Sequence, residues 1–245
     1  TRYWRDWSSD VCSSDLKTKD DFSGNRLLLE YCCSEDSMLG RKGTCTKGCR
    51  SVRLTQSTDM TKTENVSKVV KTIREFESPA ITLWASIPCT GGSSWQCINE
   101  LIYYKTGNKK ALKRLRGLRT LFRRLWLNFV IIAEEVIKAG GNICIEWPLR
   151  CLYWKDPHVK QFIQQYNLLS ATVHGCAYGL KDSKGVFLKK PWKIMTSSKI
   201  IAEGIQKKCP GDHVHGHCRG RECKRTELYT QDMVDAIHEI GRAHV

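Results

Sequence analysis

Apolar positions along the chain follow two alternating patterns. Four short apolar runs are typical of buried strands and cover residues 26–31, 51–55, 81–87 and 142–146. Between them, residues 66–76 and 108–138 carry apolar side chains at every third or fourth position, which is the spacing of one helix face. The longer segment is predicted as one long helix or a pair of helices. This order predicts an α/β fold with a Rossmann-like, mainly parallel sheet and crossover helices.

The C-terminal part has a different pattern. Residues 158–167 are typical of a further helix, and residues 171–180 and 186–196 predict a late strand pair around a turn at 182–185. The stretch 209–225 is rich in Cys, His, Arg and Gly and has no apolar period, and a short amphipathic helix is expected at 228–238. We therefore expect one domain at 17–200 with a small Cys/His-rich basic appendage at 201–238, rather than two domains.

The two ends of the chain are expected to be foreign to the fold. Residues 10–16 and 239–245 can be encoded by opposite strands of one DNA stretch that resembles a common sequencing adapter. Residues 1–16 and 239–245 are therefore interpreted as assembly artefacts, and the native ends are expected to be missing. Together they carry one more acidic than basic residue, so excluding them moves the net charge from +15 to +16.

Composition narrows the class of protein. With 245 residues, 41% of them hydrophobic, the chain is long enough for a substantial core. Its longest apolar stretch, 125–133, is interrupted by Asn128 and is too short to cross a bilayer, so no membrane span is expected. Of the 13 cysteines, the 12 that remain without Cys12 lack a regular framework spacing, which favours a reducing intracellular compartment over a disulfide-stapled secreted protein. The strong positive charge favours a polyanionic partner or, less often, an anionic membrane surface, and no protein partner is indicated.

Polar clusters follow the predicted strands. Because ligands of open α/β sheets bind beyond the carboxyl ends of the strands, residues 31–37, 58–59, 88–94 and 146–148 are expected on one rim. Cys89 is the most informative of these residues, since it follows Pro88 and precedes a Gly-rich turn that is expected to be flexible and to present the thiol to solvent. Cysteine is a strong nucleophile as thiolate. The alternative is a small buried apolar residue at a strand end.

These segments together resemble a known family. Pro88-Cys89, the earlier segment 58–61 and the later segment 143–148 are similar, in this order, to the core of the DNA cytosine methyltransferases that methylate carbon 5. Residues 190–197 also resemble a Lys-Pro-Thr strand of divergent members encoded by phages or mobile elements. The resemblance covers about residues 27–198.

The resemblance implies a mechanism and a cofactor, S-adenosylmethionine. Cys89 would add to carbon 6 of a flipped-out cytosine, and Glu146 would bond the ring at N3. Asp59 would contact the cofactor adenine, and the loop at 31–37 would wrap its methionine part. The full set of implied cofactor contacts is Tyr31, Cys32, Ser34, Ser37, Asp59 and Pro88.

The chain departs from that family at several positions. The loop after the first strand has no glycine before Gly40, Thr55 and Gln56 stand where an acidic residue is expected, and Trp147 and Pro148 follow Glu146. No separate target-recognition domain is visible. Two other hypotheses therefore stay open: a noncatalytic nucleic-acid-binding protein with this fold, and a methyltransferase of another substrate such as RNA.

A basic segment supports a nucleic-acid partner, with DNA favoured over RNA. Acidic residues are almost absent between 105 and 132, whereas a merely soluble helix face usually mixes both signs. The alternative is a solvated helix face. The candidate contacts are Lys109, Lys110, Lys113, Arg114, Arg116, Arg119, Arg123 and Arg124.

The appendage carries six candidate metal ligands within 15 residues, namely Cys209, His213, His215, His217, Cys218 and Cys223. Zinc needs four nitrogen or sulfur donors, and the Cys-x3-His and Cys-x4-Cys spacings favour Cys209, His213, Cys218 and Cys223. The alternative is a polar surface loop that contacts nucleic acid or nothing. His158 and His174 are isolated and are predicted to be structural.

Overall fold

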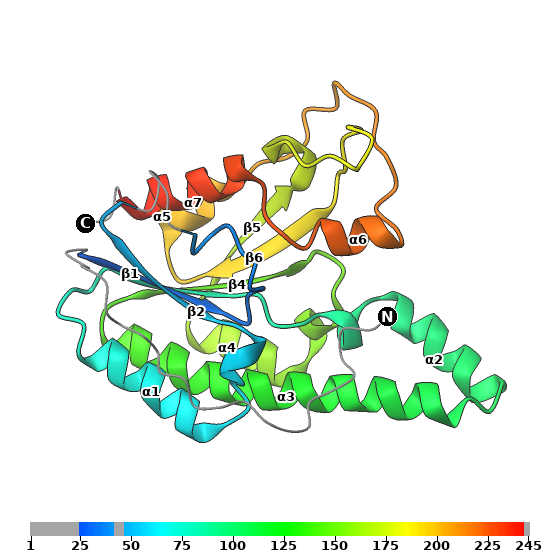
Figure 1. Ribbon diagram of the computed structural model, residues 1–245, viewed down its shortest axis with the longest axis horizontal. Helices are drawn as coiled ribbons and strands as arrows, with labels where there is room; N and C mark the ends of the chain where they lie inside the picture. The colour runs from blue at the N-terminus through cyan, green and yellow to red at the C-terminus, as the bar shows by residue number, and fades with distance from the viewer. Residues whose placement is uncertain (1–24, 42–46, 243–245) are drawn as a thin grey trace.

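The computed structural model describes residues 25–41 and 47–242, which form a mixed α/β fold around one sheet (Figure 1). The six strands are β1 (Arg26–Tyr31), β2 (Cys49–Leu54), β3 (Ile81–Ala85), β4 (Asn142–Pro148), β5 (Leu169–His174) and β6 (Pro191–Thr196). Their order in the sheet is β2-β1-β3-β4-β6-β5. The pairs among β2, β1, β3 and β4 are parallel, and β6 runs antiparallel to both of its neighbours. The predicted mainly parallel α/β fold is confirmed at this level.

Helices cover both faces of the sheet. The helices α1 (Thr63–Arg74), α3 (Lys109–Lys138) and α4 (Pro157–Gln165) pack on one face, and α5 (Lys199–Ile205) and α7 (Gln231–Arg242) pack on the other (Figure 1). Alternate residues of β1 therefore enter different cores: Leu27 and Leu29 face α1 and α3, and Leu28 faces α7. Burial on both faces explains why the parallel strands are continuous apolar runs in the sequence.

The long helix α3 leads into β4 and extends beyond the sheet (Figure 1). Asn108 caps α3, with its side-chain oxygen accepting a hydrogen bond from the Ala111 amide at 3.0 Å, and Gly140 at φ 79° follows its end. The segment 108–138 is thus a single helix, not a pair. A helix that was not predicted, α2 (Trp95–Lys105), pairs with the first turns of α3 in a hairpin that projects from the body (Figure 1).

The appendage does not stand apart from the domain. The short helix α6 (Arg221–Arg225) leads to α7, whose residues Met233, Val234 and Ile237 are buried in the same core as β6. The helix α7 runs on to Arg242, through part of the segment interpreted as foreign, while residues 1–16 lie outside the described ranges.

The late strand pair is confirmed, with shorter strands than predicted. A 3-10 turn at Gly175–Tyr178 follows β5, and the turn at 182–185 is closed by the Gly185 amide, which donates to the Asp182 carbonyl at 3.1 Å. No helix within the described ranges is long and apolar enough to cross a membrane.

Candidate functional site at the carboxyl edge of the sheet

The direction of chain connections reverses between β1 and β3. The chain leaves β1 towards β2 on one side and leaves β3 towards β4 on the other. Loops that diverge from adjacent parallel strands open a crevice between them, which is where ligands bind in such sheets. The loop at 32–41 and the segment Ser86 to Cys89 border this point, so the topology brings together two of the clusters predicted from the sequence.

Cys89 sits in a tightly packed turn. Its side chain is half-buried against the main core and precedes the 3-10 turn Thr90–Gly92. A Cβ on Gly92 would lie 2.7 Å from the ring of Tyr153, and one on Gly91 would lie 2.5 Å from the Tyr153 hydroxyl oxygen. The glycines are therefore required for close packing. The turn was expected to present the thiol to solvent, whereas the structure leaves Cys89 half-buried and packs both glycines against Tyr153.

The Cys89 thiol is not activated in this state. Burial, and after it the nearby charge of Glu146, raises the pKa of Cys89, the cation of Lys190 opposes both effects, and the resulting pKa is about 11. A thiol with this pKa is almost entirely protonated at neutral pH. The interaction with Glu146 nevertheless places the two predicted catalytic residues close enough for each other's charge to matter.

Glu146 is a buried carboxyl group on β4. Its Oε2 atom accepts a hydrogen bond from the Tyr229 hydroxyl at 3.1 Å, and its Oε1 atom has no partner among the described residues. Burial raises the pKa of Glu146 to about 7, against the opposing effects of Lys190 and of the Tyr229 hydrogen bond. At neutral pH the group can therefore give or take a proton. The Tyr153 hydroxyl, beside the Cys89 turn, is a second buried polar group without a partner in the described part of the chain.

Two residues of the site come from segments that the sequence analysis did not assign to it. Tyr229, which precedes α7, accepts a hydrogen bond from Trp84 Nε1 at 2.9 Å and lies 2.9 Å from Ser86 Oγ. Lys190 donates to the Thr226 carbonyl, and its ammonium lies 3.2 Å from Thr226 Oγ1. The appendage thus supplies buried contacts to the site. The only sequence signal for Lys190 was its place in the Lys-Pro segment before β6.

The predicted cofactor residues in and after β1 differ in how far they are buried. Tyr31 is fully buried, and its hydroxyl donates to the Leu125 carbonyl at 2.8 Å, so it is a core residue and no longer a candidate contact. Ser37 is buried and donates to Glu30 Oε1. Cys32 is half-buried, with left-handed backbone at φ 61°, and burial raises the pKa of its thiol. Ser34 is exposed, and Pro88 is half-buried.

Two carboxylates border the end of β2. Asp59 adopts φ 45°, and its Oδ1 atom accepts a hydrogen bond from Thr61 Oγ1 at 2.6 Å. Glu35 folds back from the loop after β1, and its Oε1 atom accepts hydrogen bonds from Thr55 and, at 3.0 Å, from Ser57. An acidic group therefore stands at the end of β2 although Thr55 and Gln56 follow that strand. The sequence analysis missed it because Glu35 belongs to a different loop.

The basic residues of α3 are exposed with one exception. Arg119 forms a bidentate ion pair with Glu100 of α2 at 2.9 and 2.7 Å, which ties the hairpin together and removes Arg119 from the candidate nucleic-acid contacts. The exposed members are Lys109, Lys110, Lys113, Arg114, Arg116, Arg123 and Arg124. Beside them, α2 buries none of its side chains, and Trp95 is 69% exposed.

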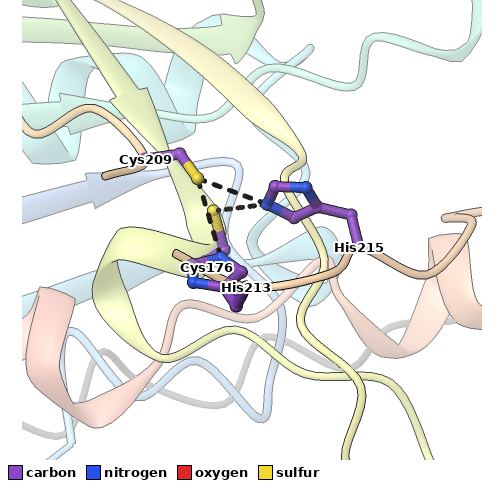
Figure 2. A group of neighbouring side chains, drawn as sticks. All are labelled: Cys176, Cys209, His213 and His215. Carbon is purple, nitrogen blue, oxygen red and sulfur yellow. Dashed lines mark hydrogen bonds between the residues drawn. The ribbon is translucent and has the colours of Figure 1, made fainter. Parts of the chain in front are cut away.

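A Cys/His group forms at the start of the appendage (Figure 2). Donor atoms of Cys176, Cys209, His213 and His215 all lie within 4.8 Å of one another, so the group could hold a metal ion. Two of the four predicted ligands, Cys209 and His213, belong to it. The other two, Cys218 and Cys223, form a separate pair with their sulfur atoms 3.9 Å apart. Cys176 was missed because it lies far from Cys209 in the sequence. His174 is structural, since its Nδ1 atom accepts a hydrogen bond from the Cys209 amide at 3.0 Å.

A cavity of about 250 Å³ lies at the opposite edge of the sheet, among Arg26, Asn142 and His238. It contains none of the predicted site residues. Because ligands of parallel sheets bind at the carboxyl edge, the cluster around Cys89 and Glu146 is the better candidate site.

Comparisons with known proteins do not identify a family or a function for this chain. A scan against protein-family models, a search of curated proteins and a search of solved structures each find no match to this chain.

The buried charge of Glu146 predicts how stability depends on pH. The folded-state pKa of about 7 exceeds the usual 4.5, so this group costs nothing below pH 4.5 and destabilises the fold as pH rises through 7. Glu146→Gln keeps the volume and removes the charge. At pH 8.5 we expect the variant to be more stable than the parent by up to about 3 kcal/mol, with no such gain at pH 4. Urea unfolding at both pH values measures this difference.

Glu135→Gln is the matched control, because Arg74 and Lys138 lower the pKa of Glu135 to about 2. This substitution should destabilise the protein at neutral pH. If Glu146→Gln does not increase the free energy of unfolding at pH 8.5, Glu146 does not carry a destabilising buried charge at that pH.

Proposed function

We propose that this chain is an S-adenosylmethionine-dependent methyltransferase that acts on cytosine in DNA through Cys89. One observation carries the proposal: Cys89 follows β3, Glu146 lies in the second half of the neighbouring parallel strand β4, and the charge of Glu146 acts on Cys89. A thiol and an acid that titrates near pH 7 at one edge are the two groups that addition to a pyrimidine ring requires.

Each residue has a defined chemical task in this proposal. The Cys89 thiolate adds to carbon 6 of the flipped-out base, and the electron pair of the 5,6 double bond moves towards carbon 5. Glu146 protonates or hydrogen-bonds N3 through Oε1, the atom without a partner in the described structure. Loss of the carbon 5 proton to solvent after methylation lets Cys89 leave. The bound cofactor supplies the methyl group as an electrophile.

Activation of Cys89 requires a proton shift. At pH values between 7 and 11 the main state is a Cys89 thiol beside a Glu146 carboxylate. The reactive pair, a thiolate beside a protonated acid, holds the same number of protons. It costs at most about 5 kcal/mol, the difference between the two pKa values, because the pKa of about 11 includes repulsion from the Glu146 carboxylate, which the protonated acid lacks. The cation of Lys190 favours the thiolate. A base that binds Glu146 through N3 would remove the repulsion between the two groups.

The residues at the end of β2 suit a nucleoside cofactor in part. Glu35, with Thr55 and Ser57, offers a carboxylate and hydroxyl groups where ribose hydroxyls could bind, and Asp59 offers a carboxylate for an amino group. The exposed Ser34 and the half-buried Cys32 would line the methionine side. Of the contacts implied by the resemblance, Tyr31 and Ser37 would act only by supporting this loop.

The projecting hairpin suits a nucleic acid. Lys109, Lys113 and Arg116 follow the i, i+4, i+7 spacing of one helix face and are exposed. On α2 the exposed Trp95 and Tyr104 offer rings for stacking. The hairpin begins a few residues after Cys89, so a nucleic-acid strand bound along the hairpin would pass close to the thiol.

A noncatalytic nucleic-acid-binding protein is the second candidate. Two observations favour it: the pKa of Cys89 is raised rather than lowered, and the loop after β1 places Cys32, not a glycine, in a left-handed conformation. Such a protein would bind nucleic acid with the same salt dependence and would have no affinity for the cofactor.

The cysteine mechanism predicts a trapped adduct. DNA that carries 5-fluorocytosine has no carbon 5 proton to lose, so the Cys89 adduct should persist after methyl transfer. With S-adenosylmethionine present, we expect the full chain to form a covalent complex that survives denaturing electrophoresis. Cys89→Ser should reduce the complex at least 100-fold, and Cys223→Ser, which changes an exposed cysteine of α6, should leave it unchanged.

Calorimetric titration with S-adenosylmethionine separates the candidates. Binding by the parent and by Cys89→Ser, weakened by Asp59→Ala, together with loss of the adduct only in Cys89→Ser, supports the methyltransferase. An adduct that persists in Cys89→Ser rejects Cys89 as the nucleophile. A folded parent that does not bind the cofactor favours the noncatalytic protein.

The basic face of α3 predicts the salt dependence of DNA binding. Each phosphate contact adds about 0.9 to the slope of log affinity against log salt for duplex DNA. Replacing Lys109, Lys113 and Arg116 by alanine should therefore reduce that slope by about 2 to 3, as measured by fluorescence anisotropy at several salt concentrations.

The matched control replaces three exposed lysines elsewhere, Lys68, Lys160 and Lys184, and removes the same charge. An equal change of slope in both triple variants would mean that net charge, not the α3 face, governs binding.

A further inference from the structure

We infer that Cys176, Cys209, His213 and His215 form a tetrahedral zinc site that joins the appendage to the turn after β5. Cys176 comes from the 3-10 turn Gly175–Tyr178, and the other three come from one loop before α6. This inference is independent of the proposed methyl transfer, because it concerns the donor atoms of one group and how the fold holds them.

The distances between donor atoms match those around a zinc ion. Cys209 Sγ lies 3.6 Å from His213 Nε2 and 3.4 Å from His215 Nε2, and His215 Nε2 lies 3.3 Å from Cys176 Sγ (Figure 2). With Zn–S bonds of about 2.3 Å and Zn–N bonds of about 2.0–2.1 Å at tetrahedral angles, sulfur and nitrogen ligands stand about 3.5 Å apart. Three of the donor–donor distances thus match this spacing, and all four donor atoms lie within 4.8 Å of one another.

Outer hydrogen bonds hold two of the donors in the orientation that a metal requires. Asp212 Oδ1 lies 2.6 Å from His213 Nδ1, which directs the other ring nitrogen, Nε2, towards the group. The Gly211 amide donates to Cys209 Sγ at 3.4 Å, as expected for a thiolate ligand. The Cys209 backbone amide donates a hydrogen bond to His174 Nδ1, which holds the backbone of Cys209 in place. These contacts come from residues that flank the ligands, so the loop is shaped around the site.

The donor chemistry selects zinc. Two thiolates and two imidazoles at tetrahedral positions are the ligand set of structural zinc sites, and all four positions are taken by protein atoms. Two thiolates also neutralise the charge of a divalent cation, which suits a group in which Cys176 is buried. The set predicted from spacing would need Cys218 and Cys223, which lie in a separate pair.

The ion would hold the appendage against the end of the sheet. The loop beside the site already makes a backbone contact, since the Gly216 amide donates to the Phe187 carbonyl at 2.8 Å. The chain then continues to Thr226 and Tyr229, which bond Lys190 and Glu146. Zinc at this position would therefore restrict the segment that leads to those two contacts.

Metal content and cobalt spectra of the full chain test the inference. We expect one equivalent of zinc that resists dialysis, and replacement by Co²⁺ should give the intense visible bands of a tetrahedral ion with thiolate charge transfer. Cys176→Ser and His215→Ala should each weaken cobalt binding by at least 10-fold, while the double variant Cys218→Ser/Cys223→Ser should bind like the parent. An octahedral cobalt spectrum, or loss of binding only in the double variant, would overturn the assignment.

Alkylation of the parent keeps the test independent of variant folding. With zinc bound, mass spectrometry should find the half-buried Cys209 protected and the exposed Cys223 modified, and a chelator should make Cys209 reactive. Equal alkylation of Cys209 with and without zinc, or a disulfide between Cys176 and Cys209 that persists with zinc added under mild reduction, would rule the site out.

Discussion

The hydrogen bond between Tyr229 and Glu146 is the interaction on which the site depends. A lone carboxylate inside a sheet is costly, and this one is retained with one oxygen bonded and the other unpartnered among the described residues. Tyr229 in turn is held by Trp84 and Ser86 of the neighbouring strand segment. One buried polar chain therefore joins β3, β4 and the appendage, so the C-terminal segment contributes directly to the candidate site.

The sheet topology explains why separate sequence clusters meet. Parallel neighbours β1, β3 and β4 end at one edge, so polar residues that follow them converge without any motif that spans them. The long helix α3 has two roles along its length. Its second half buries Phe129, Ile132 and Val136 under the sheet, and its first half carries exposed cations beyond the sheet. A single element thus connects the core with the surface proposed for nucleic acid.

The sequence predicted those parts of the fold that have an apolar period. The central strands and α3 were found because burial repeats along them, whereas α2 was missed because it buries no side chain. Local pattern likewise placed Cys89 and Glu146 among the polar residues that follow the strands, and the folded chain brings them to one edge of the sheet. It could not find Glu35 or Cys176, since their partners lie on other loops and only the folded chain joins them. Tyr31 was misassigned because a strand-end residue can face the core as well as the crevice.

The packing of Gly91 and Gly92 against Tyr153 has a consequence for how any ligand meets the thiol. Gly91 and Gly92 leave no room for an added Cβ beside Tyr153, so the backbone that follows Cys89 has little space to shift. A molecule that reached this thiol would have to fit the existing shape of the turn. Shape complementarity at this edge would then restrict which ligands can approach Cys89.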